Sequence, residues 1–359
     1  MRKILRNILL ITNIFFAAFL LMAYLAVFIN PGDFILPAFF GLLYPYLLII
    51  NIIYAVIWSV NLRIYAFISV VAIILGFNHM SGFIRPSRPG NQGEPDFTLM
   101  SYNVRMFNRY EGPGSGTTED EIKGLVTEFS PDILCIQEYY AGTGGDRLAA
   151  GFTEALGKNV ESHIKLTGRG RGSYYGIATF SRFPVVSRGE IIHPNSSSLT
   201  IYTDIAIGPD TFRIFNNHLQ SFRLRAMERS FVSEMIEGTE QRLAEARNVS
   251  MSLRDGFVKR AAQAVVLRAF IESSPHPVIV AGDFNDTPVS YSYRTIRKNL
   301  TDSFVKAGYG AGFTYKGKYP PNRIDYILHD DAIKALSFSV LRARHSDHYP
   351  VMGGFSMTN

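Results

Sequence analysis

The sequence predicts a mixed α/β domain, built from two sheets packed face to face, that follows an N-terminal region of apolar helices. Two observations predict this division. The composition changes sharply near residue 80, from almost uninterrupted apolar residues to alternating strand and helix patterns. Strand-like segments then follow one another closely, which favours packed mixed sheets over a doubly wound parallel fold.

The apolar region, residues 1–80, contains three candidate membrane-spanning helices, over 4–29, 34–60 and 64–77. The first segment exceeds the roughly 20 residues needed to cross a bilayer, whereas the third is at the short end for a span. A secretory signal peptide is the alternative for the first segment, but no small-residue cleavage site precedes Asn30.

Basic residues predict the orientation of these helices. Arg2, Lys3 and Arg6 precede the first span and Arg63 lies in the second loop, which places both on the cytoplasmic side. Three spans would then put the rest of the chain outside, although two arginines after the third span oppose this weakly. The sequence therefore predicts a multi-pass protein of the cell membrane with an extracytoplasmic soluble domain.

The charge of the soluble part is nearly balanced. The chain has 36 Lys and Arg and 30 Asp and Glu, of which six and two lie in residues 1–95. Residues 96–359 therefore carry 30 basic and 28 acidic side chains, a net charge of +2. This balance excludes the strong basic field of a protein that tracks polyanions by electrostatics alone. The single Cys135 excludes an intrachain disulfide and a cysteine-based metal cluster.

Residues 81–95 are rich in Gly, Pro and polar residues and predict a linker between the membrane region and a domain over 96–359. Helices are expected at 118–129, where Thr118 and Glu121 form a capping pattern, and within 221–273. The predicted strands cover 96–104, 132–138, 175–186, 199–207, 211–219, 277–285, 323–329 and 336–344.

Polar residues recur at these strands or just beyond them: Asn103, Glu138, Asn217 and His218, Asp283 and Asn285, Asp325, and Asp347 with His348. Each alone would be a turn former, a surface charge or a core histidine. Together they predict one convergent site. The oxygen ligands of Asn103, Glu138 and Asp347 suit a hard cation, Mg²⁺ or Mn²⁺, while the histidines and remaining carboxylates can transfer protons.

The motifs "GDFND", "RIDY" and "SDHYP" resemble those of the endonuclease/exonuclease/phosphatase superfamily, which includes deoxyribonuclease I and neutral sphingomyelinases. The resemblance covers residues 96–356, with the motifs in the family's order. It implies a four-layered α/β sandwich and metal-dependent hydrolysis of a phosphoester.

The resemblance also implies roles for the metal and proton-transfer residues. Glu138 would be the principal metal ligand, with Asn103 and Asp347 nearby. His348 would act as the base or contact the phosphate, and Asp325 would orient its ring and favour the imidazolium.

On the substrate side, the resemblance implies that Asp283 positions or deprotonates the attacking water and that Asn285 donates to the phosphate. His218 matches the second histidine of the deoxyribonuclease and sphingomyelinase branches, although no acidic partner for it is evident near "SYYGIATF". Arg105 also matches the deoxyribonuclease-like branch.

Two further residues are candidates for substrate binding. Asn217 precedes His218 in "FNNHL", and Arg171 lies in "TGRGRG", where a solvated loop is the alternative account.

These observations predict a membrane-anchored, Mg²⁺-dependent phosphodiesterase. Its substrate stays open between nucleic acid, a phospholipid or sphingomyelin headgroup, and an inositol polyphosphate. An inactive, membrane-anchored binding module is the alternative from another class. The complete set of motif residues argues against that alternative.

Overall fold

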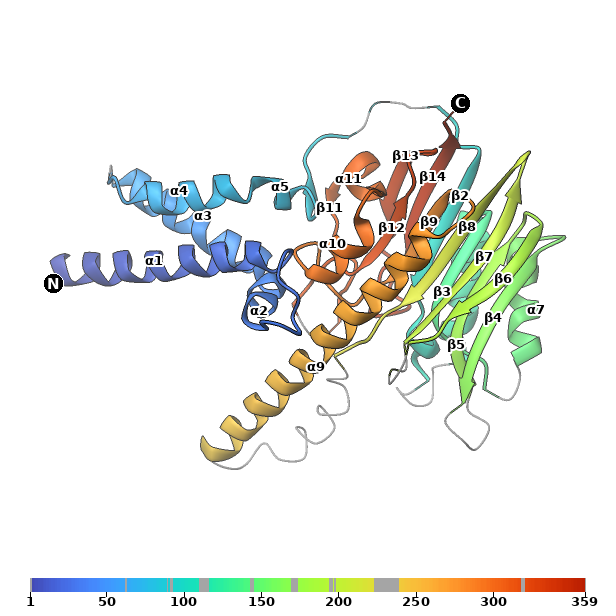
Figure 1. Ribbon diagram of the computed structural model, residues 1–359, viewed down its shortest axis with the longest axis horizontal. Helices are drawn as coiled ribbons and strands as arrows, with labels where there is room; N and C mark the ends of the chain where they lie inside the picture. Colours follow the sequence, from blue (N-terminus) through green and yellow to red (C-terminus); the bar gives the residue numbers. More distant parts are fainter. Residues whose placement is uncertain are drawn as a thin grey trace. The chain divides into compact units, whose positions relative to one another are not determined.

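The computed structural model describes residues 2–358 except 62, 89, 91–92, 110–115, 143–144, 169–173, 194–195, 197, 223–238 and 318–319 (Figure 1). The chain divides into two compact units. The first comprises Met1–Ser81, Gln220–Val265 and Asp286–Thr295, and the second comprises Gly82–Leu219, Val266–Asn285 and Ile296–Asn359.

Five helices form the N-terminal part of the first unit: α1 (Arg2–Leu25), α2 (Leu36–Leu42), α3 (Tyr44–Val60), α4 (Ala66–Leu75) and α5 (Phe77–Met80). The segment predicted as one span at 34–60 is two helices, α2 and α3, which meet at a bend of 72°. Pro45 lies in the first turn of α3, where a missing backbone N–H costs no helical hydrogen bond. Among the described residues, only Lys3–Leu25 is a single helix long and apolar enough to cross a membrane, and α2 with α3 would make a second if the bent pair is one span.

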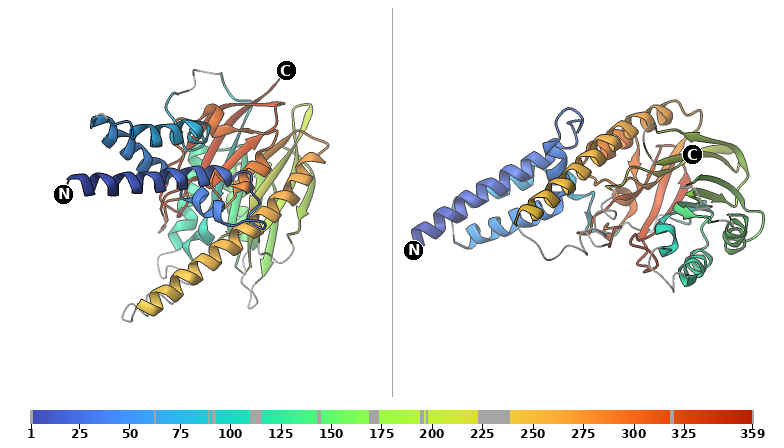
Figure 2. Two further views of the ribbon diagram at one scale, coloured as in Figure 1. Left: turned by 60° about the vertical axis from the view of Figure 1, so that its left-hand side comes forward. Right: turned by 90° about the horizontal axis from the view of Figure 1, so that it is seen from below.

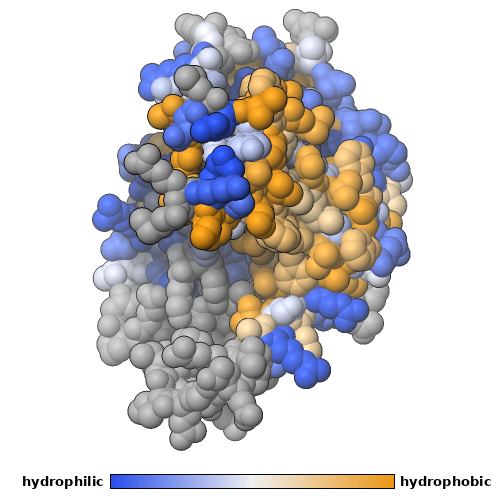
Figure 3. Space-filling model, turned by 90° about the vertical axis from the view of Figure 1, so that its left-hand side faces the viewer, coloured by the Kyte–Doolittle hydropathy of each residue, from blue (hydrophilic) through white to orange (hydrophobic). Residues whose placement is uncertain are grey.

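Helices α1, α3 and α4 lie side by side (Figure 2) and are joined by buried polar side chains. The Ser69 hydroxyl lies 2.6 Å from Asn13 Oδ1 and 3.1 Å from Asn51 Oδ1, and all three side chains are fully buried. Asn51 Nδ2 also donates to the Phe16 carbonyl at 3.0 Å. Large apolar side chains point outward instead and form the apolar area visible in Figure 3; they include Ile8, Phe15, Ile53, Val56, Phe67 and Ile74.

Two later segments of the chain belong to this first unit. The Phe39 ring of α2 packs against Phe257 with centroids 5.4 Å apart, and Thr287 Oγ1 lies 3.3 Å from the Gly41 carbonyl. Gly41 permits this approach, because a Cβ there would lie only 2.3 Å from the Val289 carbonyl oxygen.

The second unit contains two six-stranded sheets. The first sheet has the order β13-β14-β2-β3-β5-β4, and the second has the order β10-β12-β9-β8-β7-β6. Strands of the first sheet are β2 (Phe97–Asn103), β3 (Ile133–Tyr140), β4 (Glu161–Gly168), β5 (Tyr174–Ser181), β13 (Ile333–Val340) and β14 (Val351–Met357). Strands of the second are β6 (Val185–Ile191), β7 (Leu199–Ile207), β8 (Asp210–His218), β9 (Val278–Asp283), β10 (Thr301–Asp302) and β12 (Asp325–His329). Both sheets are mixed, because β2 pairs with β3 and β8 pairs with β9 in parallel.

Helices cover both outer faces of this pair of sheets. An apolar core between the sheets includes Leu99, Cys135, Ile214 and Ile279, all fully buried. Helices α6 (Gly116–Phe129) and α7 (Gly145–Leu156) pack on the outer face of the first sheet. The last turns of α9 (Thr239–Glu272) reach the second sheet, where the rings of Phe270 and Tyr202 are 6.5 Å apart. The predicted sandwich of two mixed sheets flanked by helices is therefore confirmed.

Some element boundaries differ from those expected. The segment 175–186 holds all but the first residue of one strand and the start of the next, because β5 spans Tyr174–Ser181 and Pro184 lies just before β6. Strands β4 and β14 were not predicted, although Ile164 and Leu166 alternate with polar residues in β4. Within 221–273 the structure describes one helix, α9, and residues 223–238 lie outside the described part of the chain.

The first residues of the expected linker are part of the second unit. Strand β1 (Ile84–Arg85) pairs with β11 (Gly310–Ala311), and the fully buried Arg323 donates to the Gly82 carbonyl at 2.9 Å. Arg323 also forms a buried ion pair with Asp302, the residue that caps α11 (Ser303–Ala307).

Candidate active site

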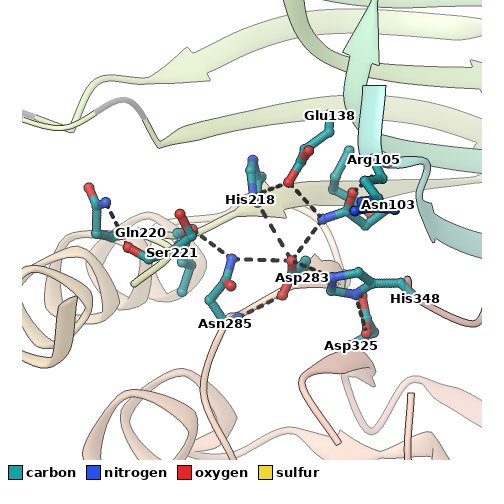
Figure 4. Close-up of polar contacts among 12 residues, drawn as sticks. Asn103, Arg105, Glu138, His218, Gln220, Ser221, Asp283, Asn285, Asp325 and His348 are labelled. Atoms are coloured by element: carbon teal, nitrogen blue, oxygen red, sulfur yellow. Dashed lines mark hydrogen bonds and ion pairs between the residues drawn. The ribbon is translucent and has the colours of Figure 1, made fainter. Parts of the chain in front are cut away.

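The site residues continue the rows of side chains that form the core between the sheets. In β8, Ile214 is a core residue and His218 lies four positions further along the same face, since side chains alternate along a strand. Asn103 follows Leu99 on β2 in the same way. Strand pairing places His218 opposite Asp283, and Asp283 opposite Asp325, on three adjacent strands. The fold thus brings these polar groups together at one end of the apolar core (Figure 4).

Asp283 is the centre of the cluster and is almost fully buried. Its Oδ2 accepts from Asn103 Nδ2 at 2.9 Å and from Asn285 Nδ2 at 3.1 Å, while Oδ1 accepts the Asn285 backbone N–H at 2.7 Å. Burial, reinforced by the nearby Asp325 carboxylate, raises the pKa of Asp283 to about 6, although His348, His218 and Asn103 act in the opposite direction. The carboxylate can therefore exchange a proton near neutral pH.

Asp325 and His348 form a buried pair. His348 Nδ1 lies 3.0 Å and 3.2 Å from the two Asp325 oxygens, and its Nε2 lies 3.8 Å from Asp283 Oδ2. Burial alone would lower the pKa of His348, but the Asp325 and Asp283 carboxylates outweigh it and raise the pKa to about 10. Tyr315 packs edge-on against the imidazole, with ring centroids 5.3 Å apart. The two carboxylates thus favour the imidazolium form of His348.

A β-bulge directs Glu138 into the site. The pairing of β3 with β5 shifts register between Gln137 and Tyr139, and Glu138 adopts a left-handed backbone with φ 51°. Such bulges re-aim side chains at functional sites. Glu138 Oε1 lies 3.5 Å from Asn103 Nδ2 and 3.7 Å from His218 Nε2.

His218 faces two carboxylates and makes no hydrogen bond with its Nε2 among the described residues. That nitrogen is buried and lies 3.7 Å from Glu138 and 3.9 Å from Asp283. The acidic neighbours that were not evident from the sequence are thus supplied by two other strands. A buried ring nitrogen without a hydrogen bond is the kind of group that a bound ligand or water satisfies.

Arg105 and Asp347 lie on loops beside the cluster. Arg105 Nε is 3.4 Å from Asp347 Oδ2, and its Nη1 donates to Asn108 at 3.1 Å. The turn that carries Arg105 is left-handed throughout, with positive φ at Arg105, Met106, Phe107 and Asn108. A run of this kind is costly for residues other than glycine and is typical of functional loops.

The site contains groups that could hold a divalent metal ion. Ligand atoms of Asp283, Asp325 and His348 all lie within 4.8 Å of one another. His348 Nδ1, however, lies 3.0 Å from Asp325, so two of these three groups already engage each other. The Glu138 carboxylate and the adjacent Asn103 amide supply oxygen ligands of the type that Mg²⁺ prefers.

Two predicted site residues, Asn285 and Asn217, have a different setting from the one expected. Both amide hydrogens of Asn285 are engaged, with Asp283 and with the Leu219 carbonyl at 3.0 Å. The fully buried Asn217 points to the opposite face from His218, where Nδ2 donates to the Ala281 carbonyl and Oδ1 accepts from Thr200. The structure therefore does not bring Asn217 to the site. Arg171 lies outside the described residues.

Sequence reasoning missed two residues that hold the site together. Ser346 Oγ donates to the Asn103 carbonyl at 2.8 Å and accepts the His348 backbone N–H at 3.2 Å. Thr314 Oγ1 accepts the backbone N–H of Asp325 at 3.1 Å. Ser346 immediately precedes Asp347 in "SDHYP", so its place in the motif was a usable signal, whereas Thr314 carries none.

Comparisons with known proteins identify the family of the second unit. The model of the endonuclease/exonuclease/phosphatase family matches residues 100–348, and that of a domain of unknown function matches residues 6–83. No curated protein matches the chain.

Solved structures share the fold at low sequence identity. A TDP2 of D. rerio, humanized by 14 mutations, is 13% identical with a TM-score of 0.53 and covers 73% of this chain and 99% of its own. An endonuclease/exonuclease/phosphatase family protein of Bacteroides thetaiotaomicron is 19% identical with a TM-score of 0.52, covering 73% and 98%. One from Beutenbergia cavernae is 17% identical with a TM-score of 0.51, covering 73% and 72%.

The chain belongs to the endonuclease/exonuclease/phosphatase family, because the family model spans well over half of it. Members of that family are metal-dependent phosphoesterases.

Proposed function

We propose that this protein is a membrane-anchored, Mg²⁺-dependent phosphodiesterase. The observation that carries the proposal is the buried Asp283 carboxylate, held in place by Asn103 and Asn285 and adjacent to the Asp325–His348 pair. Asp283 also lies 3.8 Å from His348 Nε2 and 3.9 Å from His218 Nε2. A buried carboxylate with a pKa of about 6 beside two histidines is suited to proton transfer near neutral pH.

Each residue of the cluster has a part in the proposed hydrolysis. Asp283 would align the attacking water and accept its proton, which requires that the carboxylate is ionised. His348 would donate from Nε2 to a phosphate oxygen, since Asp325 occupies Nδ1. The unpartnered Nε2 of His218 would contact the phosphate from the opposite side. Asn285 would act by holding Asp283, because both of its amide hydrogens are engaged.

Glu138, with Asn103 and Asp347 nearby, would hold Mg²⁺ or Mn²⁺. The ion would supply charge stabilisation for the phosphoryl oxygens. Arg105 would complete the subsite that binds the anionic phosphate. Its ion pair with Asp347 would fix the position of the guanidinium.

The inward polar and outward apolar side chains of α1, α3 and α4 support the membrane anchor. Exposed apolar side chains together with buried interhelical hydrogen bonds suit lipid, where such hydrogen bonds join helices and apolar side chains face the acyl chains. We propose that these helices form a multi-pass anchor and that the catalytic domain is extracytoplasmic, as the positive residues predict.

The first test is hydrolysis by the full-length protein in detergent micelles. Duplex DNA, RNA, sphingomyelin, inositol phosphates and a generic aryl phosphodiester would each be offered with Mg²⁺ and with EDTA. Turnover of a phosphodiester that EDTA abolishes is the expected result. Absence of turnover on all of them, with folding intact, would favour an inactive binding module instead.

A further inference from the structure

Two buried amides join the sheets directly beneath the site. Gln137 Nε2, on β3 of the first sheet, donates to Asn216 Oδ1, on β8 of the second sheet, at 2.7 Å. Both side chains have no exposed surface. This amide bridge is defined here as the pair Gln137 and Asn216.

The amide bridge is fixed from both sides. Gln137 Nε2 also donates to Ser101 Oγ on β2 at 3.1 Å. Asn216 Nδ2 donates to the Ala178 carbonyl at 2.9 Å and to Thr179 Oγ1 at 3.2 Å, both on β5. The bridge therefore connects three neighbouring strands of one sheet with β8 of the other, the strand that carries His218.

The bridge lies next to catalytic positions along each of these strands. Glu138 directly follows Gln137, and His218 follows Asn216 by two residues on the same face. Glu138 lies in the bulge with a left-handed backbone, which is unfavourable for a residue with a side chain. Surrounding structure must hold that conformation, and the side chain immediately before it is anchored to the opposite sheet.

Stability alone does not explain two amides at this place. Most of the layer between the sheets is apolar, and a hydrogen-bonded polar pair there contributes little net stability over an apolar pair of the same shape. Hydrogen bonds between side chains fix the orientation of the two groups and the distance between them. The distance between the sheets at this point sets the distance from Glu138 Oε1 to His218 Nε2, which is 3.7 Å.

We propose that the amide bridge positions Glu138 and His218 across the two sheets for phosphoester hydrolysis. Gln137 and Asn216 are thus positioning residues that act through their neighbours. This inference rests on the proposed function of the site.

The test exchanges the lengths of the two side chains. Gln137→Asn shortens the bridge by one methylene and Asn216→Gln lengthens it by one, whereas the double variant restores the combined length. Each single variant should lower kcat by about 10- to 100-fold with little change in KM, since displacements near 1 Å can cost that much. The double variant should recover at least about tenfold in kcat over either single one.

Binding of Mn²⁺, followed by electron paramagnetic resonance, gives a readout independent of turnover. The single variants should weaken Mn²⁺ binding by about 10-fold, as expected when a supporting residue behind a ligand is disturbed, and the double variant should restore it. Circular dichroism and the thermal midpoint identify any variant that fails to fold.

Thr203→Val is the matched control. It removes another side-chain hydrogen bond between the sheets, from Thr203 on β7 to His163 Nδ1 on edge strand β4 at 2.9 Å, away from the catalytic residues. Its kcat and Mn²⁺ affinity should stay within about twofold of the parent, a change of under 0.5 kcal/mol.

Three outcomes would overturn the inference. Single variants that match the parent in kcat and Mn²⁺ affinity would remove the positioning role. If the double variant folds but its loss of kcat equals the product of the two single losses, the two residues do not act as a bridge. If Thr203→Val loses as much kcat and Mn²⁺ affinity as the single variants, the effect is a general one of sheet packing. A parent that neither hydrolyses phosphodiesters nor binds Mn²⁺ would instead refute the proposed function, and this inference with it.

Discussion

The substitution Asp325→Asn should change the pH dependence of hydrolysis more than any other property of the protein. Asp325→Asn removes the carboxylate that lies 3.0 Å and 3.2 Å from His348 Nδ1 and keeps the shape of the side chain. The rise in the pKa of His348 from 6.5 to about 10 corresponds to roughly 5 kcal/mol in favour of the imidazolium. One adjacent carboxylate accounts for about 1–3 pKa units of such a rise.

The sign of the effect follows from which form is active. His348 donates as an imidazolium, so activity is present below its pKa and is lost as the pH rises through it. The parent should therefore lose activity near pH 10, and Asp325→Asn should lose it near pH 7–9, lower by about 1–3 units. We also expect kcat at pH 7 to fall by about 10²- to 10⁴-fold, because the ring loses its orientation.

The assay is a pH–rate profile of the full-length protein on an aryl phosphodiester with saturating Mg²⁺. Asp204→Asn is the matched control, because Asp204 is also a buried carboxylate with a bidentate cationic partner, Arg213, at 2.7 Å and 2.8 Å. The control should leave the alkaline limb in place. An alkaline limb that does not move in Asp325→Asn would refute the assignment of that limb to His348.

Four further predictions concern the other groups of the site and the anchor. Asp283→Asn should abolish turnover while Mn²⁺ binding is retained. In the parent, activity should rise as the pH passes about 6, where Asp283 ionises, and a pH–rate profile without that rise would contradict the role of Asp283. Glu138→Gln should raise the Mg²⁺ concentration for half-maximal activity, whereas Glu161→Gln, remote on β4, should not. His218→Gln should lower kcat by about 10²- to 10⁴-fold without changing the Mg²⁺ requirement, and a changed requirement would make His218 part of the metal site. An alkaline phosphatase fused after residue 90 should be active and a green fluorescent protein there dark, and the opposite pattern would reverse the proposed topology.

The family, the fold class and most of the residues that meet at the site could be predicted from the amino-acid sequence. Short motifs at strand ends sufficed, because a strand that leaves an apolar core carries its terminal side chains to a predictable face. That reasoning holds for Asp283 and His218, the last residues of β9 and β8. It does not hold for Asn217, since adjacent residues on a strand point to opposite faces and only the register of the sheet decides which one enters the site.

Tertiary structure alone decided how the groups interact. The carboxylates near His218 come from β3 and β9, which are remote from it in sequence, so no local pattern could identify them. The left-handed backbone of Glu138 arises from a bulge against β5, and a bulge is a property of two paired strands. The break between α2 and α3 and the buried contacts of Ser69 with Asn13 and Asn51 likewise depend on packing between helices. A sequence fixes which side chains are available, whereas distances of 3 to 4 Å between them follow from the pairing and packing of whole elements.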